Sequence, residues 1–138
     1  MREILFRAKA INRDKGYHRT DYKNGDWVYG IITKLYDERF ENLPAEMRDV
    51  DGVNGIDVDY KTVGQYTGLT DKNGAKIFEG DIIRALMDFG PAGLLERIAL
   101  VGWHDKYGYQ WNYFDTDTIE VIGNIHDNPE LLGGAENG

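Results

Sequence analysis

Residues 64–83 read Gly-Gln-Tyr-Thr-Gly-Leu-Thr-Asp-Lys-Asn-Gly-Ala-Lys-Ile-Phe-Glu-Gly-Asp-Ile-Ile, and the rest of the chain is organised around this stretch. Its Asp71-Lys72-Asn73-Gly74 segment carries three turn-favouring residues between apolar neighbours, which predicts a tight hairpin or bulged turn. We expect the Asp71 carboxylate to cap that turn. A second turn, Glu79-Gly80-Asp81, follows at once and leads into an apolar strand over 82–87. The stretch therefore turns the chain twice and delivers it into the core.

Downstream of this stretch, short apolar or alternating segments separated by turn residues predict several more strands. No helix-length apolar period interrupts them, so a small antiparallel barrel or roll is the most economical arrangement. Asn128-Pro129-Glu130 predicts one helical turn with Asn128 as its N-cap, followed by a flexible Gly-rich tail. The predicted strands after residue 87 cover 97–103, 109–114 and 119–125.

Upstream, the chain predicts a less regular β-rich portion packed on the barrel. Alternation over 4–11 indicates a half-buried strand, and 27–36 is the strongest strand by composition. Residues 37–46 favour a helical turn or an irregular loop, and 56–60 alternates as an edge strand does. No internal repeat is visible. The expected organisation is one compact unit built from residues 1–62, the C-terminal barrel 63–132 and the tail 133–138.

Composition sets the class of protein. The chain has 138 residues with 17 Gly, 9 Tyr and no Cys, which favours a mostly β globular protein and excludes disulfides, thiolate metal sites and thiol nucleophiles. The N-terminus has no apolar stretch long enough for a signal peptide, and no segment approaches the length of a membrane span. We expect a cytoplasmic protein that uses no cofactor and makes no membrane contact.

Charge is unevenly distributed along the chain. The net charge of −8 argues against general nucleic-acid binding, because such binding needs clustered cations. Residues 1–24 are nevertheless basic, and their cations Arg7, Lys9, Arg13 and Lys15 are the candidate nucleic-acid contacts. A basic end and an acidic body can also attract each other within or between subunits, or both can be solvated surface.

Catalytic and metal-binding patterns are weak. A calcium loop starting at Asp49 fails, because its sixth and twelfth positions are Asn54 and Tyr60 rather than Gly and Glu. The chain contains no serine or cysteine nucleophile and no phosphate-binding glycine loop. A metal-assisted hydrolytic site formed by His104, His126 and a carboxylate stays open as a minor alternative.

Aromatic residues crowd one predicted hairpin. The odd positions of 109–113 share a strand face, and this face is either core or an exposed platform for a protein partner or stacked bases. The few basic residues nearby favour a protein partner or self-association. The candidate partner-binding residues are Trp103, Tyr107, Tyr109, Trp111 and Tyr113.

Three segments resemble the YopX family. The first is Gln65-Tyr66-Thr67-Gly68-Leu69 with the two turns that follow it. The second comprises Arg2-Glu3-Ile4-Leu5-Phe6-Arg7-Ala8 and Trp27-Val28-Tyr29-Gly30, and the third is residues 121–132. The resemblance implies a phage or prophage origin and a β-rich fold with an SH3-like barrel in the C-terminal half. It implies no reaction, since the family supplies no catalytic residue to carry over.

These observations leave three functional hypotheses. The leading one is a non-enzymatic phage accessory protein that binds a protein partner and self-associates into a homo-oligomer. The second is a nucleic-acid-binding modulator of replication or transcription that uses the basic N-terminal segment. The third is the metal-assisted hydrolase.

Overall fold

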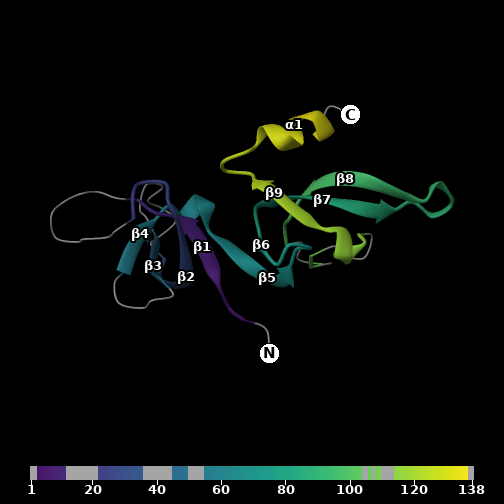
Figure 1. Ribbon diagram of the computed structural model, residues 1–138. Coiled ribbons are helices and arrows are strands. Elements are labelled where there is room, and N and C mark those ends of the chain that lie inside the picture. Colours follow the sequence, from purple (N-terminus) through teal and green to yellow (C-terminus); the bar gives the residue numbers. More distant parts are fainter. Residues whose placement is uncertain are drawn as a thin grey trace. The chain divides into compact units, whose positions relative to one another are not determined.

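The computed structural model describes residues 3–11, 22–35, 45–49, 55–103, 106, 108–109 and 114–136. In this part of the chain the protein is mostly antiparallel β-structure with three short 3₁₀ helices and one α-helix. The chain divides into two compact units, Met1–Gln65 and Tyr66–Gly138 (Figure 1). The division lies close to the expected boundary between residues 62 and 63.

The first unit is a regular antiparallel sheet in the order β4-β3-β2-β1-β5. The 3₁₀ helix η1 (Tyr60–Thr62) precedes β5, which begins in this unit and continues into the second. The strands are β1 (Phe6–Lys9), β2 (Trp27–Lys34), β3 (Ala45–Asp49), β4 (Gly55–Val58) and β5 (Gly64–Thr70).

Strand β3 corrects the sequence interpretation at its start. Residues 45 and 46 belong to a strand, where the sequence predicted a helical turn or an irregular loop over 37–46, and 36–44 lies outside the described residues. Ala45 and Met47 are buried and alternate with Glu46 and Arg48, so this segment has the period of a strand with one buried face.

The residues that follow β1 form hydrogen bonds with β4. Ala10 forms an isolated antiparallel bridge with Val58. The Ile11 N–H donates to the Asp57 carbonyl and the Asp59 N–H to the Lys9 carbonyl, both at 2.8 Å. This linkage encloses a small core made of Ala8, Ala10, Val28, Ala45, Met47, Ile56 and Val58.

The second unit contains the pair β5–β6 and a separate three-stranded sheet in the order β8-β7-β9. Ile77, Ile83, Ala85, Val101 and Ile119 form its core. Helix α1 extends through residues 133–136, where the sequence analysis expected a tail. The elements are β6 (Lys76–Phe78), β7 (Asp81–Asp88), η2 (Gly90–Ala92), β8 (Leu94–Leu100), η3 (Thr116–Thr118), β9 (Glu120–Asn124) and α1 (Glu130–Glu136).

The predicted closed barrel in the C-terminal half is wrong for the residues that the structure describes. No strand ladder joins the β5–β6 pair to the β8-β7-β9 sheet there. Single hydrogen bonds make the connection instead, such as that from the Lys72 N–H to the Ile119 carbonyl at 2.8 Å. The interruption arises because the turn at Asp71 takes up backbone groups that a barrel would use in a ladder.

Both units contain the same motif, a 3₁₀ helix that leads into a strand (η1 into β5 and η3 into β9). In the first unit, the Thr62 hydroxyl donates to the Asp59 carbonyl (2.7 Å) and accepts from the Lys9 N–H (2.8 Å). In the second, the Thr118 hydroxyl donates to the Asp115 carbonyl (2.6 Å) and accepts from the Leu86 N–H (2.9 Å). Each aspartate carboxylate also accepts from the backbone N–H two residues later, at 3.0 Å for Asp59 and 3.2 Å for Asp115.

Strand pairing extends this correspondence. Arg7 lies opposite Gly64 and Tyr29, and Arg84 lies opposite Glu120 and Ile98. Arg7 in β1 therefore corresponds to Arg84 in β7. This likeness was not visible as an internal repeat in the sequence, because besides the arginine the two units share only an aspartate, a threonine and the β-branched residue that follows the threonine.

Candidate functional site

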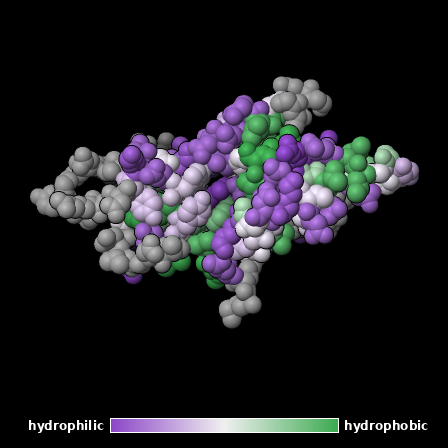
Figure 2. Space-filling model, viewed as in Figure 1, coloured by the Kyte–Doolittle hydropathy of each residue, from purple (hydrophilic) through white to green (hydrophobic). Residues whose placement is uncertain are grey.

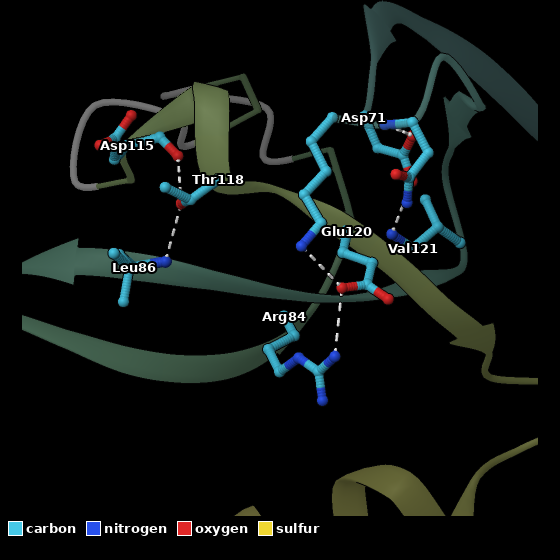
Figure 3. Close-up of polar contacts among 9 residues, drawn as sticks. Asp71, Arg84, Leu86, Asp115, Thr118, Glu120 and Val121 are labelled. Atoms are coloured by element: carbon cyan, nitrogen blue, oxygen red, sulfur yellow. Dashed lines mark hydrogen bonds and ion pairs between the residues drawn. The ribbon is translucent and has the colours of Figure 1, made fainter.

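The Asp71 carboxylate organises the stretch from which the fold was predicted (Figure 3). Its Oδ1 accepts from the Asn73 and Ala75 N–H groups, both at 2.9 Å, and its Oδ2 accepts from the Val121 N–H at 3.0 Å. The Asp71 residue is only 7% exposed. One side chain thus shapes the β5–β6 turn and attaches strand β9 to it. The expected capping role of Asp71 is confirmed.

Ionisation of Asp71 follows from these bonds. Burial alone would raise the pKa of this carboxyl group. The N–H donors of Val121, Ala75 and Asn73, together with the nearby Lys72 charge, outweigh burial and hold the pKa below its ordinary value. A carboxylate that is ionised and saturated by backbone donors suits a structural role rather than proton transfer.

Other polar residues of the signature also bind backbone groups. Asp81 is 1% exposed and its Oδ2 accepts from the Phe78 N–H at 2.7 Å, which confirms its capping role. Asn124 Oδ1 accepts from the N–H groups of His126 (3.0 Å) and Asp127 (2.9 Å). The Asn128 Oδ1 accepts from the Asn124 N–H at 3.3 Å, so this side chain bonds backwards rather than to the N–H groups of α1.

Glu120 joins two cations beside Asp71. Its Oε2 lies 3.1 Å from Lys72 Nζ and 3.1 Å from Arg84 Nη2 (Figure 3). Hydrogen bonds from Lys72 and then Arg84 lower the pKa of Glu120. All three side chains are substantially exposed, and an exposed ion cluster of this kind contributes little to stability.

The described ranges bear on the metal part of the hydrolase hypothesis. They contain no group of three His, Cys, Asp or Glu side chains placed to hold a metal ion. In the turn after β9 the His126 N–H donates to Asn124 Oδ1, and His104 lies outside the described residues. The pairing of the two histidines in the hydrolase hypothesis therefore stays a prediction.

The predicted aromatic surface is described only in part. Trp103 is 56% exposed, and its ring meets Tyr109 edge to face with centroids 5.0 Å apart. Tyr109 is half-buried against the core of the second unit, and its hydroxyl donates to Glu79 at 2.9 Å. Tyr107, Trp111 and Tyr113 lie outside the described residues.

Arg7, one of the four candidate nucleic-acid contacts, is buried. Arg7 is only 6% exposed, and its guanidinium carbon lies 4.6 Å from the centre of the Trp27 ring. Lys9 Nζ lies 5.4 Å from the same ring. An arginine covered in this way cannot reach a nucleic-acid phosphate in this conformation. Arg13 and Lys15 lie outside the described residues.

Sequence analysis missed an exposed apolar surface in the second unit. Residues 88–97, at the end of the β7–β8 hairpin, are all exposed. Leu94 and Leu95 are each 50% exposed, Leu100 is 47% exposed and Phe89 is 41% exposed. Figure 2 shows hydrophobic residues gathered on this hairpin. The signal available in the sequence was the Leu94-Leu95 pair directly after a Gly-Pro turn.

The described helices include none that is long and apolar enough to cross a membrane.

Comparisons with known proteins agree with the signature. No curated protein sequence matches this chain. Protein EF1440 from Enterococcus faecalis, solved by crystallography, is similar in fold, with a TM-score of 0.54 and 24% identity over 96% of this chain and 99% of the other. The YopX protein family model matches residues 6–133. This match covers nearly the whole chain, and the chain therefore belongs to the YopX family.

Proposed function

We propose that this protein is a non-enzymatic accessory protein of a phage or prophage that acts by binding proteins, first of all a second copy of itself. It would do so in the cytoplasm of an infected or lysogenic host. One observation carries the proposal: the polar side chains of the signature are engaged by backbone groups, whereas the β7–β8 hairpin presents large apolar side chains to solvent.

The polar side chains of the signature bind the protein's own backbone. Asp71, Asp81, Asn124 and Asn128 each accept backbone N–H groups. Side chains held in this way stabilise turns. This supports a role for the signature in folding.

The exposed apolar side chains of the β7–β8 hairpin favour association with another molecule. A two-stranded hairpin is marginally stable in water by itself, and contiguous exposed apolar surface is typical of interaction sites. Leu94 and Leu95 lie where the hairpin has left the core cluster of Ile83, Ala85 and Ile119. Contact with a second molecule would remove this surface from water and support the hairpin.

The resemblance also implied an SH3-like arrangement. We propose such an arrangement for the first unit, where a 3₁₀ helix precedes the last strand in the order β4-β3-β2-β1-β5.

Sedimentation equilibrium tests the proposed association. The wild-type protein should associate at tens of micromolar, and the double variant Leu94→Glu/Leu95→Glu should be monomeric, since burying two carboxylates opposes association. Tyr60→Glu is the matched control, because Tyr60 is 53% exposed but belongs to the first unit. Circular dichroism must show that all three proteins are folded. A monomeric wild-type protein would contradict the proposal.

A further inference from the structure

The outer edge of β8 has the geometry of a strand-pairing site. Strand β8 pairs with β7 through an unbroken register from Asp88 opposite Leu94 to Ile82 opposite Leu100. At the two ends of this ladder, Phe89 N–H donates to the Gly93 carbonyl and Val101 N–H to the Asp81 carbonyl. Because backbone direction alternates along a strand, Leu94, Glu96 and Ile98 direct their N–H and C=O groups to the opposite edge.

That edge has few of the features that prevent pairing. In the part of the chain that the structure describes, no strand pairs with it. It contains no proline, lysine or register shift between Leu94 and Leu100.

We propose that two copies of this chain pair antiparallel through β8, with Leu95 facing Leu95 of the second copy on the two-fold axis. This inference rests on the proposed self-association and adds its site and register. It would join the β8-β7-β9 sheets of the two molecules into one continuous sheet.

The charges of Glu96 and Arg97 restrict which residue of β8 can lie on the two-fold axis. A two-fold axis through Arg97 or Glu96 would place like charges directly opposite each other, which is destabilising. An axis at Ile98 would use residues that are already half-buried, whereas 94–97 is exposed. With the axis at Leu95, an apolar pair lies at the centre. Each of the two flanking Leu94–Glu96 pairs then exchanges two backbone hydrogen bonds.

Cysteine cross-linking tests this register directly, because the chain contains no cysteine. Residues opposite each other in a non-hydrogen-bonded pair have Cα atoms about 4.5 Å apart, within the range that a disulfide spans. The Leu95→Cys variant should therefore form a disulfide-linked dimer under mild oxidation. The same treatment should leave the exposed-site control Tyr60→Cys mostly monomeric on a non-reducing gel.

The outcomes separate the register from the function. If the wild-type protein dimerises in sedimentation but Leu95→Cys cross-links no better than Tyr60→Cys, the β8 register is wrong and self-association stands. Preferential cross-linking of Ile98→Cys would likewise overturn the register. A wild-type protein that stays monomeric overturns both proposals. Efficient cross-linking of Leu95→Cys alone supports both.

Discussion

Arg7 and Arg84 occupy corresponding places in the two units but have different surroundings. Arg7 is covered by the Trp27 ring, whereas the Arg84 side chain is 43% exposed and bonds Glu120 at 3.1 Å. The position of Glu120 is taken by Gly64 in the first unit. The common motif therefore depends on the aspartate and threonine that bind the backbone, and the neighbouring strand residues are free to differ.

The largest expected effect concerns Gly30, which corresponds to Ala99 because both lie opposite the residue before the shared arginine. A Cβ on Gly30 would collide with the Arg48 carbonyl and lie 2.8 Å from Asp49 Cα. We expect Gly30→Ala to cost about 3 kcal/mol or more of unfolding free energy, because backbone cannot move aside easily.

Urea unfolding measures this cost, and hydrogen exchange of the Ala10 and Leu86 amides assigns it to the first unit. The matched control is Ala99→Gly, which should cost only about 0.5–1 kcal/mol. Equal losses for the two variants would show that the units do not differ at this position.

Asp71 has no counterpart among the shared motif residues and should give the next largest effect. Asp71→Asn replaces one acceptor oxygen with an NH₂ group that faces backbone donors, so we expect a loss of about 2–3 kcal/mol. Asp115→Asn is the control, because Asp115 is exposed and its carboxylate accepts one N–H at 3.2 Å. A similar small loss for both variants would contradict the role given to Asp71.

Acid should affect the second unit through the same carboxylate. Because folding lowers the pKa of Asp71, its contribution is fully present above the unfolded-state pKa of about 4 and is lost as the pH falls through the lower folded-state value. Unfolding free energy of the wild type should therefore decline below about pH 4. In Asp71→Asn this decline should be shallower, as measured by urea titration at several pH values.

The two threonines test the shared motif itself. Thr62→Val and Thr118→Val each remove a hydroxyl that makes two hydrogen bonds. We expect a loss of about 1–2 kcal/mol for Thr62, which is 7% exposed, and a smaller loss for half-buried Thr118. Exchange of the Lys9 and Leu86 amides should accelerate in the respective variants. Unchanged exchange would show that the hydroxyls do not hold these strands.

The smallest effect is expected at Arg84. Arg84→Gln removes an exposed ion pair, so the loss should stay below about 1 kcal/mol and disappear at high salt. Arg7→Gln should lower the unfolding free energy more than Arg84→Gln, because it leaves a cavity beneath Trp27. This loss should not depend on salt. Urea unfolding with and without added salt distinguishes the two sites.

Sequence reasoning was strongest where one residue determines local backbone geometry. The Asp71 carboxylate lies two residues before the Asn73 amide that it accepts, and the Asp81 carboxylate lies three residues after the Phe78 amide. Gly74 and Gly80 adopt the positive φ that these turns need. Strands β2 and β7 were recognisable from their apolar composition.

The remaining features depend on distant contacts. In strand β3 buried and more exposed residues alternate over only five positions. Ala45 and Met47 are identifiable as core residues only once the pairing of β3 with β2 and β4 is known. The likeness between the two units was missed because it rests on threonine hydroxyls that accept from distant strand N–H groups. Such bonds leave no periodic pattern in the sequence. The exposed hairpin was missed for a related reason, since Leu94 and Leu95 have the composition of a core strand but extend beyond the core.

The three hydrogen bonds of Asp71 also imply an order of events during synthesis. The bonds to Asn73 and Ala75 join near neighbours and can form as soon as the hairpin leaves the ribosome, whereas the bond to Val121 spans fifty residues. The nascent chain would thus carry a prepared but incomplete turn until β9 emerges. Truncation before residue 121 should leave the first unit folded and the hairpin without its last partner.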